Sequence, residues 1–161
     1  MSLAVQRRWN GLKWQCSAFE QLSSSELYEV LRLRQEVFIV EQNCPYLDAD
    51  GTDRSSYHLL GWSEEDKRLV AYARLVKPGI KYAEASIGRV VTSSSARGTG
   101  CGKLLVAEAI VQIKSLCPGI GIRISAQQYL ERFYKEFGFE TVSPPYDEDG
   151  IPHIEMLWRA K

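Results

Sequence analysis

The first helical pattern in the chain covers residues 24–42. Its stripe keeps the three- and four-residue spacing of one helix face and consists of Leu27, Val30, Leu31, Arg34 and Phe38. Ser23 precedes the segment, and Glu26 stands three residues later. This is the spacing of a capping box, in which the two side chains bind N–H groups of the first turn. We therefore predict a helix that begins directly after Ser23.

Two further segments have helical spacing. Residues 100–116 are followed closely by Pro118, which cannot continue a helix. Residues 129–137 place apolar side chains at i, i+3, i+4 and i+7, namely Leu130, Phe133, Tyr134 and Phe137. Gly138 is suited to a C-cap position. We predict a long helix in the first segment and a short helix in the second.

Short apolar segments that alternate with polar turns indicate β-strands. They are residues 14–19, 57–62, 69–76, 85–92, 121–126 and 153–159. Residues 43–56 are predicted to form a loop. Strand hairpins come first and a strand–helix–strand crossover follows, which predicts an α/β (α+β) fold. No internal repeat or linker interrupts the chain, so we expect residues 1–161 to form a single domain.

Composition adds limits on the class of protein. Hydrophobic residues make up 45% of the 161 residues and charged residues 25%, as in folded proteins. Lys+Arg and Asp+Glu both number 20, so the net charge does not favour nucleic acid or an anionic membrane as a partner. The sequence contains no apolar run of the roughly 20 residues that span a bilayer, and no signal peptide pattern. The four cysteines are dispersed, which favours reduced thiols and a cytoplasmic location.

The segment "SSSARGTGCGKLL", residues 93–105, places three alternating glycines before a predicted helix. A Walker A loop would require glycine where Arg97 stands and serine or threonine where Leu104 stands. A dinucleotide motif G-x-G-x-x-G would place its third glycine at Lys103 or Leu105. Neither of these phosphate-binding templates fits the segment.

What remains is Arg97-x-x-Gly100-x-Gly102 between a strand and a helix. Glycines let the backbone approach an anion closely, and the first amides of a helix are unsatisfied donors at its positive end. The guanidinium of Arg97 adds a charged fork suited to phosphate. This turn therefore fits a pyrophosphate, and the alternative is a flexible glycine loop with an incidental arginine.

The arrangement R/Q-x-x-G-x-G/A after a strand resembles the acyl-coenzyme A signature of the GNAT N-acetyltransferases. The resemblance extends over seven blocks in the expected order, and together these blocks resemble the ElaA-like branch of that superfamily. The blocks are "LRQEVFIVEQNCPYLDADGTD", "HLLG", "AYARL", "IGRVV", "RGTGCGKLL", "FYKEFGF" and "DEDGIPHIEM". The resemblance implies a GNAT fold with a mixed, twisted sheet of six or seven strands. Helices flank this sheet, which splits near its middle to admit acetyl-CoA.

The resemblance also implies which residues bind acetyl-CoA. A central strand pairs its backbone with the pantetheine arm, helped by a bulge that frees N–H groups, and the following helix N-terminus holds the pyrophosphate. The implied residues are Val90, Val91 and Thr92 on the strand and Arg97, Gly98, Thr99, Gly100, Cys101, Gly102 and Lys103 in the turn. Gln127 stands where many relatives place an asparagine that contacts the cofactor arm.

Tyr134 matches the tyrosine that lies near the cofactor sulfur in many GNAT enzymes and acts as a general acid. The alternative is a core aromatic, because Tyr134 lies on the apolar stripe of its helix. The general base is open, because the strand segment "SIGRVVT" offers no carboxylate. The candidate bases are Glu41, His58, Glu84 and His153. Cys101 and Cys44 have no evident histidine partner, which argues against an acyl-cysteine intermediate.

The segments "DADGTD" and "DEDG" are rich in acidic residues. The first does not fit a calcium loop, because Asp53 and Leu59 replace the required glycine and glutamate, and we predict no metal site. Both are either solvated turns or parts of an acceptor mouth that attracts an amine. The expected reaction is acetyl transfer to a small-molecule or peptide amine. The alternatives are a non-catalytic acyl-CoA sensor and a protein-lysine or N-terminal acetyltransferase, and a homodimer is possible by analogy.

Overall fold

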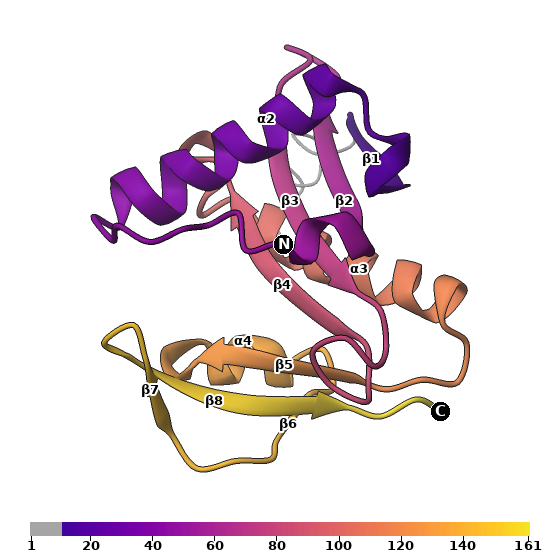
Figure 1. Cartoon of the computed structure of the whole chain (residues 1–161), viewed down its shortest axis with the longest axis vertical. Helices are drawn as coiled ribbons and strands as arrows, with labels where there is room; N and C mark the ends of the chain where they lie inside the picture. Colours follow the sequence, from indigo (N-terminus) through magenta and orange to yellow (C-terminus); the bar gives the residue numbers. More distant parts are fainter. Residues whose placement is uncertain (1–10) are drawn as a thin grey trace.

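The computed structural model describes residues 11–161, which form two four-stranded antiparallel sheets lying side by side (Figure 1). The first sheet has the order β1-β2-β3-β4, with β1 at Leu12–Ala18, β2 at Ser56–Ser63, β3 at Leu69–Val76 and β4 at Ser86–Thr92. The second has β8 (Ile151–Trp158) between β5 (Ile122–Gln127) and the short strands β6 (Glu140–Thr141) and β7 (Tyr146–Glu148). All these ladders are antiparallel.

The predicted strands are present, and most of their ends lie within one or two residues of the expected positions. Strand β3 is the predicted segment, Leu69–Val76, and every residue in it is buried. The described residues hold eight strands rather than six or seven, because β6 and β7 were not predicted. These two strands have only two and three residues, all exposed. An apolar alternation therefore never develops in them.

Helix α2 (Ser24–Arg34) begins directly after Ser23, as the capping box predicts. The Ser23 hydroxyl accepts from the amide of Glu26 at 3.0 Å, and the Glu26 carboxylate accepts from the amide of Ser23 at 2.8 Å. The helix continues as a π-helical segment, η2 (Gln35–Glu41). Such segments are frequent at functional sites.

Helix α3 (Cys101–Leu116) and helix α4 (Glu131–Lys135) correspond to the other two helical predictions. The short 3-10 turns are η1 (Phe19–Gln21), η3 (Thr52–Ser55), η4 (Ser94–Ala96) and η5 (Gln128–Leu130). In the described part of the chain, no helix is both long and apolar enough to cross a bilayer.

Strand β3 supplies the core on both faces, since successive side chains point to opposite sides of a sheet. Ala71 and Ala73 belong to the cluster that includes Leu105 and Val106 of α3. Tyr72 belongs to the second cluster, which includes residues of α2. Helices α3 and α2 therefore cover opposite faces of the first sheet.

The two sheets adjoin along β4 and β5, where only one isolated parallel bridge joins them, between Ala85 and Ile122. Its hydrogen bonds run from the amide of Ala85 to Gly121 O at 3.1 Å and from the amide of Arg123 to Ala85 O at 2.8 Å. Beyond this bridge the two strands diverge (Figure 1). The expected split near the middle of the sheet is therefore present.

Candidate active site

A cavity of about 740 Å³ lies in the opening between β4 and β5. Both sheets, η2 and the loop before β2 contribute to its lining. The predicted site residues that line it are Val90, Val91, Thr92, Arg97, Gln127, Tyr134 and His153. Segments far apart in the sequence thus meet at one cavity, large enough for an extended ligand and a second, smaller one.

Strand β4 carries a bulge where it borders the cavity. Tyr72 pairs with Val91 and Arg74 pairs with Gly88, so two steps on β3 match three steps on β4. Arg89 lies within this bulge and has a φ of 47°, in the left-handed region. A bulge leaves one residue out of the ladder, which makes backbone donors of β4 available to a ligand in the cavity.

The glycine-rich turn leads from β4 into α3 with the geometry expected for an anion site. Gly98 has a φ of 71° and Gly100, the N-cap, has a φ of 86°. An L side chain is strained at such angles, so glycine is suited to both positions. The amide of Leu104 donates to Gly100 O, which leaves the preceding amides of the first turn without intrahelical acceptors. A diphosphate placed here would meet these N–H groups and the positive end of the helix dipole.

Two other residues of the turn have roles of their own. Lys103 forms a surface ion pair with Glu136 at 3.0 Å, with both side chains about half exposed. Cys101 is fully buried, and burial raises the pKa of its thiol to about 11. Because the thiolate is the nucleophilic form, this geometry agrees with the sequence argument against an acyl-cysteine at this position.

Arg97 forms an ion pair with Glu41, the last residue of η2. Both side chains are partly exposed, and Arg97 lines the cavity whereas Glu41 does not. Glu41 therefore lies at the entrance to the predicted anion site rather than beside the reacting end of the cavity. Glu84 is also engaged elsewhere, in an ion pair with Arg123 at 3.0 Å.

Tyr134 of α4 is both a core residue and a cavity residue. Its side chain is 7% exposed and packs edge-on against Phe133 and Phe139. Among residues 11–161 its phenol has no hydrogen-bond partner, while the ring lines the cavity. Burial, with a smaller contribution from Tyr129, raises the pKa of Tyr134 to about 12. The phenol therefore stays protonated at neutral pH and can donate a proton.

His153 of β8 lines the same cavity and is held on both sides. Its Nδ1 is 2.8 Å from Ile151 O, and its Nε2 is 3.2 Å from the Glu148 carboxylate. A carbonyl oxygen only accepts, so Nδ1 carries a hydrogen, and the Glu148 carboxylate accepts from Nε2 only when the ring is protonated. Glu148 also accepts from Ser125 Oγ at 3.2 Å. This arrangement can accept a proton at Nε2 and stabilise the resulting imidazolium.

Glu148 and Asp149 come from the tight turn that joins β7 to β8. Glu148 pairs with Ile151, and the two residues between them, Asp149 and Gly150, have φ angles of 53° and 80°. These are the angles of a two-residue hairpin turn of type I′, for which Asp-Gly is a preferred pair. The "DEDG" segment is thus a turn whose acidic residues border the cavity, and this dipeptide was the signal that could have predicted β7.

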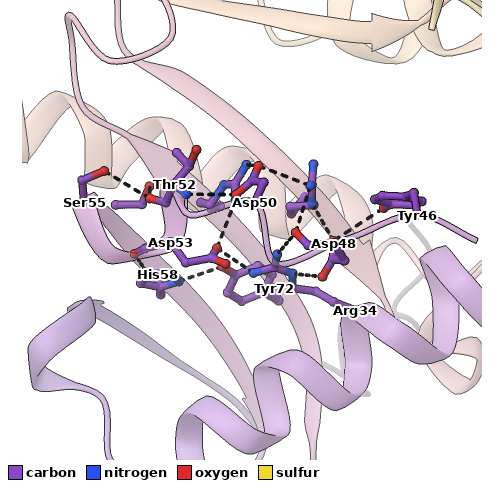
Figure 2. A network of polar contacts seen from close by, with 12 residues as sticks. Arg34, Tyr46, Asp48, Asp50, Thr52, Asp53, Ser55, His58 and Tyr72 are labelled. Carbon is purple, nitrogen blue, oxygen red and sulfur yellow. Dashed lines mark hydrogen bonds and ion pairs between the residues drawn. The ribbon is translucent and has the colours of Figure 1, made fainter. Parts of the chain in front are cut away.

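Asp48 and Asp53 of the first acidic segment bind a buried arginine of α2 (Figure 2). Arg34 is fully buried, and its guanidinium donates to Asp48 Oδ2 at 2.8 Å and to Asp53 Oδ1 at 2.7 Å. A buried charge requires a partner with hydrogen bonds. The aspartates of the loop therefore neutralise the arginine on the apolar stripe, and the arginine neutralises them.

Two further arginines complete the network. Arg74 donates to Asp50 and Asp53, and Arg89 donates to Asp48 Oδ1 at 2.7 Å. Three carboxylates thus face three guanidinium groups, and the charges cancel. The expectation of a solvated turn at "DADGTD" is wrong, because Asp48 and Asp53 are each 7% exposed. Sequence reasoning tested this segment for calcium and missed its pairing with arginines.

His58 of β2 lies beneath this network and not at the cavity. It is fully buried, with Nδ1 2.7 Å from the Tyr72 hydroxyl and Nε2 2.9 Å from Asp53 O (Figure 2). Because the carbonyl accepts from Nε2, the Tyr72 hydroxyl donates to Nδ1 and the neutral ring is satisfied. Burial lowers the pKa of His58, and the charges of Arg34 and Arg74 lower it further. We therefore do not retain His58 as a candidate base.

We expect the unfolding free energy to decrease as pH falls below about 6.5, the ordinary value for histidine. A folded-state pKa below that value means that the unfolded chain binds the proton more readily, so acid favours unfolding. Urea unfolding at pH 7.5, 6.5 and 5.5 measures this decrease. His58→Gln should remove it, whereas His153→Gln, at the other histidine of the chain, should leave it in place. A decrease that persists in His58→Gln would contradict this assignment.

Comparisons with known proteins find relatives over most of the chain. A family model described as an acetyltransferase (GNAT) domain matches residues 21–160. The chain is 49% identical over 149 residues to a UPF0039 protein of Synechocystis, covering 92% of this chain and 96% of that protein. It is 42% identical over 147 residues to the protein ElaA of Escherichia coli, covering 90% and 95%.

Two solved structures are similar to this chain in both sequence and fold. An acyl-CoA N-acyltransferase from Pseudomonas aeruginosa is 41% identical, with a TM-score of 0.85 over 91% of this chain and 99% of that chain. The crystal structure of Escherichia coli ElaA is also 41% identical, with a TM-score of 0.85 over 92% and 99%.

Proposed function

Because the chain belongs to the GNAT acetyltransferase family, we propose that it transfers an acetyl group from acetyl-CoA directly to the amine of an acceptor. Membership in this family makes the chain an acyltransferase, and the acetyl donor and the amine acceptor are the proposed part. The single observation that carries the proposal is the continuity of one cavity from Arg97 at the glycine-rich turn to Tyr134 and His153. A cofactor and an acceptor can therefore occupy the same opening.

In the proposed complex, the pyrophosphate of acetyl-CoA binds at the turn and the pantetheine arm follows β4. The backbone amides and Arg97 supply donors for the diphosphate. The bulged segment of β4 supplies N–H groups for the arm and for the thioester oxygen, where negative charge develops in the transition state. Gln127, at the end of β5, lines the cavity opposite β4.

The transfer needs one base and one acid. The amine nitrogen attacks the thioester carbon, the new C–N bond forms, and the C–S bond breaks to release the thiolate. His153 Nε2 takes the proton that the amine loses, and Tyr134 gives a proton to the sulfur. Holding both reactants in one cavity provides much of the acceleration through proximity.

A non-catalytic acyl-CoA sensor is the second candidate function. It is favoured by the sequence of β4, SIGRVVT, which carries no carboxylate that could act as a base next to the thioester. A sensor would retain the pyrophosphate turn and bind coenzyme A without turnover. The proposed acid and base, Tyr134 and His153, favour the enzyme over the sensor.

The proposal is tested by two measurements on the purified chain. Calorimetry should detect binding of coenzyme A, and Arg97→Ala should weaken that binding about tenfold through loss of a charged hydrogen bond. Thiol release from acetyl-CoA should then occur with members of an amine panel that includes amino acids, polyamines and lysine peptides. Binding without thiol release would favour the sensor, and absence of binding would overturn both functions.

We expect Glu41→Gln to tighten the binding of coenzyme A about threefold, the size that a partly exposed ion pair contributes. The Glu41 carboxylate competes with the diphosphate for Arg97, so its removal leaves the guanidinium available. Pantetheine, which has no diphosphate, should bind both proteins equally. Glu36→Gln removes an exposed ion pair with Arg32 on the same helical segment and should leave the affinity unchanged. Weaker binding in Glu41→Gln would show that the pair positions Arg97 instead.

A further inference from the structure

Two charged side chains that line the cavity make no ion pair among the described residues, Lys81 and Asp149. Lys81 lies in the segment between β3 and β4, and Asp149 lies at the tip of the β7–β8 turn. The other cations of the cavity each have a carboxylate partner: Arg74 and Arg89 bind the first acidic segment, and Arg97 binds Glu41. One unpaired positive charge and one unpaired negative charge therefore remain within the same cavity.

Lys81 lies among other positively charged side chains that line the cavity. Its side chain is exposed within the cavity opening. Desolvation by the surrounding residues lowers the pKa of its ammonium, Glu148 raises that pKa, and Arg74 and Arg89 lower it. Its ammonium lies 5.3 Å from the centre of the Tyr82 ring. Arg74, in the same wall, has a buried Nε without a hydrogen-bond acceptor in residues 11–161. This wall of the cavity thus has more donors than acceptors.

The opposite wall has the reverse composition. The Glu148 carboxylate lies 3.2 Å from His153 Nε2, and Asp149 follows Glu148 in the turn. Carboxylates at this place can bind an ammonium group next to the nitrogen that takes its proton. The three aspartates of the first acidic segment cannot do so, because their charges are already matched by arginines.

Gly88 leaves room between the two walls. It lines the cavity, and a Cβ built at this position would meet nothing within 4 Å. It pairs with Arg74 across β3 and β4, so its absent side chain would point to the same face of the sheet as the arginine. No side chain at this position therefore takes up space in the cavity that Lys81 and the β7–β8 turn both line.

We infer that the acceptor is an amine that also bears a carboxylate, as amino acids do, with Lys81 binding the carboxylate and the Glu148–Asp149 turn binding the amine. The inference rests on the proposed acetyl transfer and specifies its substrate class. A polyamine would place a second positive charge beside Lys81 and be repelled, whereas an amino acid would place its carboxylate there and form an ion pair. The two acceptor classes therefore differ in the sign of one interaction.

Turnover with matched acceptors tests the inference. Thiol release from acetyl-CoA is measured for a panel of α-amino acids and for the carboxamide of each, which keeps the amine and removes the negative charge. We expect kcat/KM to be about tenfold higher for the amino acid of each accepted pair. Lys81→Met should bring this ratio close to one, whereas Lys77→Met, in the same segment but outside the cavity lining, should preserve it. Equal rates for the two members of each pair, or an unchanged ratio in Lys81→Met, would overturn the inference.

A second measurement separates this inference from the proposed function. Binding of N-acetylglycine and N-acetylglycinamide to the complex with coenzyme A is measured by calorimetry, which requires no turnover. Tighter binding of the carboxylate in the wild type, lost in Lys81→Met, supports carboxylate recognition even when no amine releases thiol. Equal affinity for the two compounds overturns the inference of carboxylate recognition, even when carboxylate-free amines are acetylated and the proposed transfer holds.

Discussion

Tyr134→Phe is expected to lower kcat about 100-fold, the lower end of the effect of a general acid, while the binding of coenzyme A stays unchanged. The substitution removes only the hydroxyl. The ring keeps its edge-on contacts with Phe133 and Phe139, and the hydroxyl makes no hydrogen bond within residues 11–161 whose loss would destabilise the fold. The thiolate of coenzyme A would then leave without a proton donor. Single-turnover thiol release with saturating acetyl-CoA measures the chemical step.

Tyr129→Phe is the matched control for this substitution. Tyr129 also lines the cavity, and its side chain is 77% exposed. We expect Tyr129→Phe to keep kcat within about twofold of the wild-type value, because the removed hydroxyl is at the surface and makes no contact in the transition state. The pKa of Tyr134 near 12 also predicts that the wild-type enzyme keeps its donor protonated throughout pH 7–10. Undiminished turnover in Tyr134→Phe would exclude the tyrosine from the mechanism.

Arg34→Met should destabilise the protein by about 3–5 kcal/mol, the cost of removing one partner from a buried ion pair. The substitution leaves Asp48 and Asp53 buried without the guanidinium that binds both. The side chain of methionine fills a similar volume, so the loss reports charge and hydrogen bonding rather than a cavity. Urea unfolding followed by tryptophan fluorescence at pH 7.5 measures the change in unfolding free energy.

Arg32→Met offers the same chemical change two residues earlier on α2. Arg32 pairs with Glu29 and Glu36 at the surface, and such pairs contribute about 0–1 kcal/mol each. The two variants therefore differ mainly in the burial of the lost guanidinium. Equal destabilisation in both would contradict a structural role for the network beneath the cavity.

The parts of the fold that could be predicted from the sequence are those with a local cause. The capping pair Ser23 and Glu26 determined the start of α2, and the apolar run 69–76 determined β3. The bulge in β4 was expected only through the family resemblance, because nothing in "SIGRVVT" indicates which residue leaves the ladder. Gly98 and Gly100 were informative because their positive φ angles are a local requirement.

The parts that could not be predicted depend on partners distant in the sequence. Arg34 lies 14 residues from Asp48 and 19 residues from Asp53 in the chain, so no local pattern connects them. An arginine on an apolar helix stripe is the signal that a buried acidic partner exists, but it does not identify that partner. The burial of His58 could not be predicted either, because an isolated histidine in a strand has the same sequence context whether it faces a cavity or the core.

The single bridge between Ala85 and Ile122 has a consequence for the protein before it meets any ligand. Past this point β4 has a neighbour on one side only, so it behaves as an edge strand inside the molecule. Unpaired strand edges are templates for pairing with another chain. A cofactor arm laid along β4 would occupy that edge, so saturation with coenzyme A would protect the enzyme against self-association during storage or heating.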